Sequence, residues 1–168
     1  MQNLLTIVIP TYNEEDYIID TLFSVIDQSG TKGVKIIIAD ANSTDKTVEY
    51  CEGIKRDFDL NLEIIEGGLP AVGRNNGAKL ATTPYVLFLD ADSGFTCKNA
   101  IRKALRPLVF GGASVVSTTP SYKGEPDIKA SFMFMVNKII TMILSKYSPC
   151  GIGGFTLVYK PFFDEVGG

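Results

Sequence analysis

Two carboxylates follow an apolar stretch of this sequence at a point where folding alone gives them little purpose. The run from Tyr85 to Leu89 is large and apolar, and Asp90 and Asp92 come directly after it. Ionised carboxylates beside an apolar core repel each other and resist desolvation, which predicts a positively charged partner. If the chain stays extended here, both side chains project to the same side and can face one cation. Oxygen ligands suit Mg²⁺ or Mn²⁺, which keep waters and share their coordination with phosphates. An acidic turn or a helix N-cap is the alternative, because a D-x-D pattern alone is weak evidence.

Three further stretches contain side chains that could bind a nucleotide. In "PTYNEE", Pro10 is expected to end a strand, Tyr12 could stack on a base, and Asn13 is expected to cap the next helix. Asp40, after "IIIA", could accept a hydrogen bond from a base or a ribose hydroxyl, or could be a turn residue. Arg74, in "GRNNGAK", lies near the expected start of a helix and suits a diphosphate, although a surface arginine is equally consistent with its position.

The elements that must position these residues alternate between strand and helix. Continuous apolar runs predict buried strands, and apolar residues at helical spacing between them predict crossover helices. This alternation indicates a parallel sheet that is covered on both faces, in which ligands bind beyond the carboxyl ends of the strands. The expected strands are 4–9, 34–39, 62–65 and 85–89, and the expected helices are 14–29, 42–58 and 70–81.

The pattern becomes less regular after residue 95. The helix expected at 130–145 has an apolar face wider than one packed side requires, so it could be core, lie on a membrane surface or meet another segment. Pro161 is expected to open the last helix. The other elements expected in this part are a helix at 97–109, interrupted by Pro107, and strands at 113–118 and 155–159.

Composition narrows the function classes. The 168 residues suffice for one domain, and a net charge of −3 without a basic face predicts no nucleic-acid binding. The absence of histidine excludes His-based catalytic triads and metal sites with histidine ligands. Carboxylates are therefore the main candidates for acid–base chemistry. Three widely spaced cysteines predict a reduced, cytosolic chain without zinc. No apolar run reaches 18 residues, and the N-terminus is typical of a first strand rather than a signal peptide.

Four ordered stretches together resemble a known family. "TIVIPTYNEE", "IIIADANSTDKT", "GRNNGAKLATTPYVLFLDADS" and "GIGGFTLVYKPFFDEVGG" are similar to the family 2 glycosyltransferases of GT-A fold, from residue 4 to the last residue. Two departures stand out. Ala41 occupies a position where the family often has a second aspartate, and the chain reaches Gly168 before the acidic pair that supplies the family's general base. The resemblance therefore implies a domain that is truncated at its C-terminus.

The resemblance implies a three-layer Rossmann-like sheet, mostly parallel, in one domain spanning 1–168. Residues 1–95 would form the nucleotide-sugar donor half, and residues 96–168 would form a partial acceptor half. The Asp90-Ala91-Asp92 segment would be the family's D-x-D and hold the ribose and the metal-bound diphosphate. The other implied donor-site residues are Pro10, Thr11, Tyr12, Glu14, Asp40 and Arg74, and Gly153 and Gly154 would lie on the acceptor side.

The implied reaction is an inverting sugar transfer that depends on Mg²⁺ or Mn²⁺. The donor would be a nucleoside-diphosphate sugar, and the acceptor a hydroxyl of a glycan, a polysaccharide or a lipid carrier in cell-envelope biosynthesis. The chain would work in the cytoplasm or at the inner face of the membrane, with membrane contact through 130–145. The base is expected beyond Gly168, and if the chain is nevertheless fully active, Glu125, Asp127 and Asp164 are the candidates.

Three other readings stay open at this point. A sugar-nucleotide nucleotidyltransferase would need a glycine-rich, basic loop after the first strand, where this chain has an acidic one. A receiver-type signalling domain also binds Mg²⁺ at strand-end aspartates, but the chain is too long and too irregular after residue 95. A donor-binding fragment without turnover is the third reading.

Overall fold

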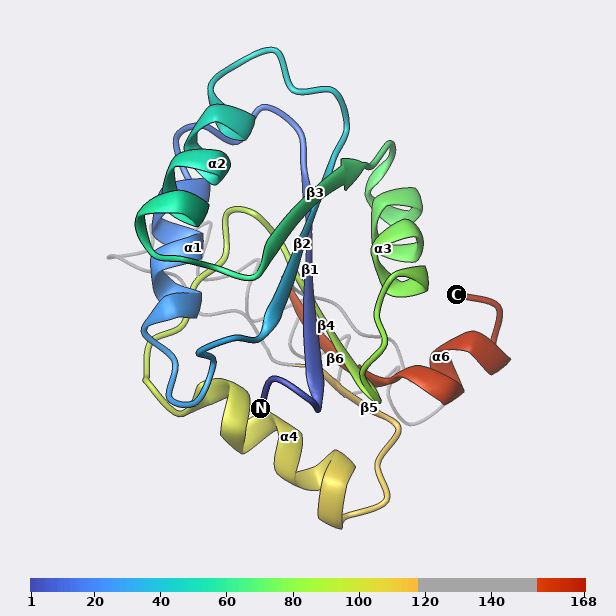
Figure 1. The fold of residues 1–168 in the computed structure, drawn as a ribbon. Coiled ribbons are helices and arrows are strands. Elements are labelled where there is room, and N and C mark those ends of the chain that lie inside the picture. The colour runs from blue at the N-terminus through green and yellow to red at the C-terminus, as the bar shows by residue number, and fades with distance from the viewer. Residues whose placement is uncertain (118–153) are drawn as a thin grey trace, which may run out of the picture.

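The computed structural model describes residues 1–117 and 154–168 (Figure 1). The predictions for Gly153, Glu125, Asp127 and the helix at 130–145 concern positions outside the described residues. The strands are β1 (Leu5–Thr11), β2 (Lys35–Asp40), β3 (Leu62–Glu66), β4 (Tyr85–Leu89), β5 (Val115–Ser117) and β6 (Phe155–Tyr159). The helices are α1 (Ile18–Ile26), α2 (Thr47–Asp57), α3 (Pro70–Lys79), α4 (Ala100–Phe110) and α6 (Lys160–Glu165).

The described strands form one sheet in the order β3-β2-β1-β4-β6-β5. The strands β1 to β4 run parallel to one another, whereas β6 is antiparallel to both β4 and β5. The chain moves outward from β1 to β2 and β3 and then returns to β4 on the other side of β1. This reversal makes the carboxyl ends of β1 and β4 a topological switch point, where open α/β sheets bind their ligands. The predicted mostly parallel, Rossmann-like sheet is confirmed.

Helices cover both faces of the sheet, which gives three layers (Figure 1). One core lies between the sheet and α1, α2 and α4, and a smaller core lies under α3 and α6. Because the central strands are buried on both faces, β1 and β2 are continuous apolar runs rather than alternating ones. Burial raises the pKa of the Cys51 thiol in α2 to about 12, so this cysteine is a core residue with little reactivity.

The helix α3 packs unusually close to the sheet because two of its residues lack side chains. A Cβ atom on Gly77 would lie 2.3 Å from a methyl carbon of Val8 in β1. A Cβ on Gly73 would lie 3.3 Å from the Cβ of Ala39 in β2. The two glycines, which weaken the helical pattern in the sequence, therefore set the distance between α3 and the strands.

Two details of the first strand and its loop differ from the prediction. Pro10 does not end β1, which continues to Thr11 with Pro10 in register with Ala39 of β2. The pairing of β1 with β4 ends earlier, at Val8, so the proline lies beyond that ladder. Asn13 does not cap α1, because this helix begins only at Ile18 and its N-cap position, Tyr17, makes no side-chain capping bond.

The later elements agree more closely with the sequence pattern. The bounds of β4 and β6 are those predicted, and Pro161 is the second residue of α6. The helix α4 includes Pro107 and begins three residues later than predicted, and β5 begins two residues later than predicted. Among the described residues, no helix is long and apolar enough to cross a membrane.

Candidate functional site at the switch point

The ends of β1 and β2 are joined through a buried carboxylate. Thr11 and Asp40 are register partners, and the Thr11 hydroxyl donates to Asp40 Oδ1 at 2.8 Å. The backbone N–H of Ser43 donates to Asp40 Oδ2 at 2.8 Å, and the Ser43 hydroxyl donates to Oδ1 at 2.6 Å. A carboxylate has about four acceptor positions, so three are already occupied by the protein. The main role of Asp40 is therefore to anchor the loop after β2. About one acceptor position of its carboxylate is left for a hydrogen-bond donor of a ligand.

Asn13 connects the loop after β1 to the loop after β2. Its backbone N–H donates to the Ser43 hydroxyl at 2.9 Å, and its side-chain oxygen accepts from the N–H of Thr44 at 2.8 Å. Asn13 and Asn42 both have positive φ, at 53° and 60°, a conformation that asparagine tolerates better than most residues. The side chain that was expected to cap a helix instead joins two loops.

A second set of bonds holds the next residues of the same loop. The N–H of Glu14 donates to the Thr47 hydroxyl at 2.7 Å, and that hydroxyl donates to Asp45 Oδ1 at 2.6 Å. The N–H of Glu15 donates to Asp45 Oδ2 at 3.0 Å. Partial desolvation raises the pKa of Asp45, but hydrogen bonds from Thr47 and Glu15 outweigh it and hold that pKa below its ordinary value. We call these bonds between residues 13–15 and 43–47 the interloop network.

The interloop network leaves two side chains of the first loop at the edge of the sheet. The Tyr12 side chain is 59% exposed, so its ring can take a stacking partner. Partial burial, followed by the nearby charges of Asp92, Asp45 and Asp90, raises the pKa of Glu14. The influence of Asp90 and Asp92 on Glu14 shows that the loop after β1 and the loop after β4 share one electrostatic environment.

The residues after β4 form a turn, which was the alternative to the extended segment in the sequence analysis. The N–H of Ser93 donates to the carbonyl of Asp90 at 3.1 Å and closes this turn. The buried Thr21 of α1 donates from its hydroxyl to the carbonyl of Ala91 at 2.5 Å, and the N–H of Asp90 donates to the carbonyl of Gly154 at 2.8 Å. The backbone of the Asp90–Asp92 segment is thus fixed from two sides, while the side chain of Asp92 is exposed.

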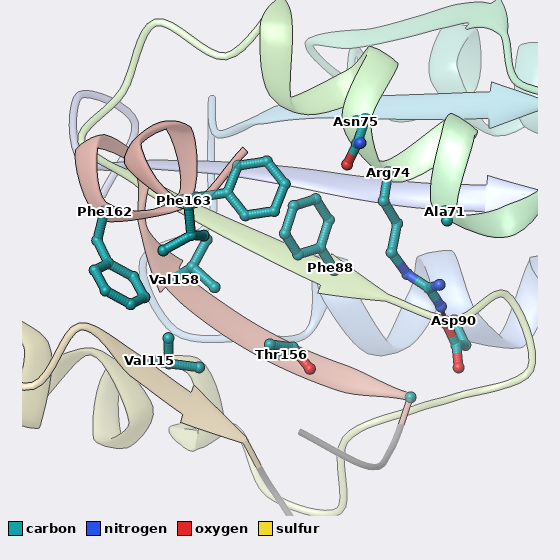
Figure 2. Close-up of a pocket in the computed structure, with 12 residues that line it drawn as sticks. Ala71, Arg74, Asn75, Phe88, Asp90, Val115, Thr156, Val158, Phe162 and Phe163 are labelled. Carbon is teal, nitrogen blue, oxygen red and sulfur yellow. Dashed lines mark hydrogen bonds and ion pairs between the residues drawn. The ribbon is translucent and has the colours of Figure 1, made fainter. Parts of the chain in front are cut away.

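Arg74 supplies a positive partner for Asp90, whereas the sequence pattern predicted a metal ion beside these carboxylates and assigned Arg74 to a diphosphate. Its guanidinium group extends from α3 and forms an ion pair with Asp90, and both side chains are half-buried (Figure 2). Gly154, at the start of β6, lies against the same site. A Cβ there would be 2.1 Å from the Ser93 hydroxyl oxygen and 3.3 Å from the Asp90 Cβ. A larger residue here would force the Ser93 side chain to move and would crowd the Asp90 Cβ, so glycine lets β6 approach the turn closely.

A pocket of about 660 Å³ lies beside the ion pair on the α3 and α6 face of the sheet (Figure 2). Arg74, Asn75 and Asp90 form its polar end. Phe88 of β4 and Phe163 of α6 pack with their ring centres 5.2 Å apart and form part of its apolar wall. The remaining lining residues are Ala71, Val115, Gly154, Thr156, Val158, Phe162 and Val166.

The donor set of the site fits a cation that is bound together with a phosphate ligand. Within residues 1–117 and 154–168, no three or more Cys, Asp or Glu side chains are grouped so that they could hold a metal ion. Asp90 and Asp92 could supply two carboxylates, and Asp90 is already paired with Arg74. Mg²⁺ and Mn²⁺ accept one or two carboxylates and complete their coordination with water and substrate phosphates.

Several of these residues were missed by the sequence analysis. Ser43, Asp45 and Thr47 were read only as residues typical of a helix start, although their partners lie about thirty positions away in the loop after β1. Thr21 was placed in a helix without a role. The one available signal was the dense run of hydroxyl and carboxylate residues in "NSTDKT".

The fold and the arrangement of residues at the switch point define a Rossmann-like α/β domain with a polar ligand site at its carboxyl edge. The model of glycosyl transferase family 2 matches residues 6–167, so the chain belongs to this family. The predicted membership is confirmed.

Two curated relatives are named for teichoic acid biosynthesis and for poly(ribitol-phosphate). The minor teichoic acid biosynthesis protein GgaA of Bacillus subtilis is 33% identical over 96% of this chain and 40% of its own length. The poly(ribitol-phosphate) beta-glucosyltransferase of Bacillus spizizenii is 37% identical over 52% of this chain and 14% of its own length. The chain thus spans less than half the length of these relatives.

Solved structures agree on the fold. A mannosyltransferase from Pyrobaculum calidifontis, solved with GDP-Man and Mn²⁺, superimposes with a TM-score of 0.79 at 21% identity, over 100% of this chain and 48% of that one. Residues 1–349 of TarS from S. aureus, solved with UDP-GlcNAc, give a TM-score of 0.67 at 19% identity, over 97% and 47%. These likenesses confirm the predicted GT-A sheet.

Proposed function

We propose that this chain forms the donor-binding half, residues 1–95, and part of the acceptor half, residues 96–168, of a glycosyltransferase. The enzyme moves a sugar from a nucleoside-diphosphate sugar to an acceptor hydroxyl. One observation carries the proposal. In a chain that belongs to glycosyl transferase family 2, the loops after β1 and β2 and the Arg74–Asp90 ion pair lie at the same switch point of the sheet.

The residues divide the donor between them. The exposed ring of Tyr12 stacks on the base, and Asp40 offers its remaining acceptor position to the base or the ribose. We place Pro10, Thr11 and Glu14 beside the same nucleotide, next to Tyr12 and Asp40 on the loop and strand ends of β1 and β2. Arg74 binds the diphosphate, since a guanidinium group matches phosphate oxygens through two parallel hydrogen bonds.

The Asp90-Ala91-Asp92 segment would hold Mg²⁺ or Mn²⁺ together with the diphosphate. A bound cation would neutralise the negative charge of the leaving diphosphate. The mannosyltransferase of the same fold was solved with GDP-Man and Mn²⁺, which supports this assignment. Ala91 contributes no side-chain ligand, because its side chain is a methyl group, and its backbone carbonyl already accepts from the Thr21 hydroxyl.

The transfer that we propose inverts the configuration at the anomeric carbon of the sugar. The acceptor oxygen forms a bond to this carbon as the bond to the diphosphate oxygen breaks, and a carboxylate takes the acceptor proton. Among the described acids of the last helix, Asp164 already accepts from Lys160 at 2.6 Å. We assign the base to none of the described residues.

We place the acceptor in cell-envelope glycan synthesis at the cytoplasmic side of the membrane. GgaA is named for teichoic acid biosynthesis, and it is similar to this chain over nearly the whole chain length. The pocket beside Asp90 supports this proposal, since its apolar wall and polar end suit an acceptor with both characters, such as a lipid-linked glycan. Gly154 lies at the junction of this pocket with Asp90 and marks the acceptor side.

The test is a titration of the chain with UDP, GDP, CDP and ADP by calorimetry, with Mn²⁺ and with a chelator. We expect one diphosphate to bind, and to bind more tightly with Mn²⁺. No binding of any of the four would overturn the proposal. Transfer from the matching donor sugar to a lipid-linked acceptor is measured separately, because binding without transfer would support a donor-binding fragment. Release of pyrophosphate from a nucleoside triphosphate and a sugar phosphate would instead support a nucleotidyltransferase.

A further inference from the structure

The loop that presents Tyr12 and Glu14 obtains its shape from another loop. The N–H groups of Asn13, Glu14 and Glu15 all donate to side chains in residues 43–47. These three consecutive donors have no helix or strand partners, since β1 ends at Thr11 and α1 begins at Ile18. The conformation on both sides of the Glu14 side chain therefore depends on acceptors supplied by the β2–α2 loop.

Asp45 is the central acceptor of this arrangement. It accepts directly from the N–H of Glu15, and it accepts from the Thr47 hydroxyl that in turn accepts from the N–H of Glu14. It also accepts from the N–H of Thr47, which fixes it to the start of α2. Thr47 is fully buried, so no water can replace its hydroxyl in the chain of bonds.

We propose that Asp45 and Thr47 are positioning residues for donor binding. They contact no ligand themselves, but they hold residues 13–15 in the conformation that directs Tyr12 and Glu14 toward the nucleotide. This inference rests on the proposed function and extends it to two residues to which no role was assigned. It means that the loop is formed before the donor arrives, so that little conformational entropy is lost on binding.

The charge of Asp45 makes the proposal sharp, because positioning and simple electrostatics predict opposite results. Asp45→Asn removes a negative charge from an edge that already contains Glu14, Asp90 and Asp92. If Asp45 were only a surface charge, its removal would leave the affinity for an anionic diphosphate unchanged or increase it. If Asp45 positions the loop, the amide nitrogen placed opposite the N–H groups disrupts the network and the affinity falls.

The experiment compares matched variants of the whole chain. Thr47→Val keeps the shape of the buried side chain and removes the hydroxyl, whereas Thr47→Ser keeps the hydroxyl. Asp16→Asn removes the same charge as Asp45→Asn, but from an exposed position of the β1–α1 loop. Two readouts are used: calorimetry with the diphosphate that the wild type binds, and hydrogen exchange of the amides of residues 13–15 without ligand.

We expect Asp45→Asn and Thr47→Val to weaken binding by about fivefold to twentyfold, on the scale of one lost charge-assisted hydrogen bond. The amides of residues 14 and 15 should exchange at least about tenfold faster, while those of β1 and β2 keep their rates. Thr47→Ser and Asp16→Asn should bind like the wild type. Unchanged exchange, or faster exchange with unchanged affinity, overturns the proposal. If the wild type binds no diphosphate, the proposed function is lost, and the exchange of residues 14 and 15 still decides whether Asp45 holds the loop.

Discussion

The two halves of the carboxyl edge are built in opposite ways. At the ends of β1 and β2, the polar side chains bond mainly to the protein itself, through Asp40 and through the interloop network. At the end of β4, the backbone is fixed by Thr21 and Gly154, but Asp92 is exposed, and Asp90 has one charged partner among the described residues, Arg74. Within the described residues, the first half has used most of its hydrogen-bonding capacity, and the second keeps more of it available.

This difference matches the two parts of a nucleoside diphosphate. A base and a ribose are bound well by a surface that is already shaped, because preformed loops lose little entropy on binding. A diphosphate with a cation needs charges that can exchange partners. The Arg74–Asp90 ion pair can do so, since each of its members can take a phosphate or a cation in place of the other.

The largest effect is expected from the helix that supports Arg74. Gly77→Ala should lower the free energy of unfolding by about 1–3 kcal/mol, because the new methyl group would overlap Val8. Gly53→Ala in α2 is the matched control. It meets nothing within 4 Å, and it should raise stability by about 0.5–1 kcal/mol through helix propensity. Urea unfolding of both variants measures the contrast, and equal effects would show that α3 is not held by close packing.

Tyr12→Ala tests the preformed half. We expect nucleotide binding to weaken by about 1–3 kcal/mol, on the scale measured for aromatic–base stacking. The loss should be the same with Mn²⁺ and with chelator, since the ring contacts the base and not the diphosphate. Calorimetry with both conditions checks this. An unchanged dissociation constant for UDP, GDP and CDP alike would remove Tyr12 from the site.

Asp92→Asn tests the half that keeps its charges available. We expect the Mn²⁺-dependent part of diphosphate binding to disappear, a loss of about tenfold or about 1.4 kcal/mol, with unchanged stability. In chelator, the variant and the wild type should bind alike. If the wild type binds equally well with and without Mn²⁺, the metal assignment is wrong and the contrast between the halves loses its chemical meaning.

The smallest effect concerns Glu14, where the two halves meet. The pKa of the Glu14 carboxyl group is raised in the folded chain. The folded state therefore binds the proton of this carboxyl group more tightly than the unfolded state does. Stability from this group is therefore present below the unfolded value of 4.5 and is lost as pH rises through the folded pKa. Glu14→Gln should be more stable than the wild type by about 0.5 kcal/mol at pH 7 and equal to it near pH 4. Glu49→Gln, at an exposed position of α2, is the matched control for the loss of one negative charge.

The strands were predictable because each is a local apolar run, and β4 and β6 have the predicted bounds. The loops were not, because their structure comes from bonds between residues about thirty positions apart. Asn13 is a residue type that often caps helices, yet its hydrogen-bond partners are Ser43 and Thr44 in another loop. The turn at Asp90 depends on Thr21 and Gly154, which no local pattern connects to it. The sequence therefore indicated which kinds of side chain follow the strands, but it did not indicate how these side chains are arranged relative to one another.

The position of β6 between β4 and β5 has a consequence for how the chain folds. The parallel strands β1 to β4 can pair as soon as they have been synthesised, but β5 has no neighbour in the sheet until β6 arrives from much later in the sequence. Until then the outer edge of β4 is unpaired, and such an edge is a site where chains aggregate. Pairings between distant segments also form slowly. We expect pulse-labelled hydrogen exchange during refolding to protect the amides of β1 and β2 first and those of β6 last, and simultaneous protection would contradict this order.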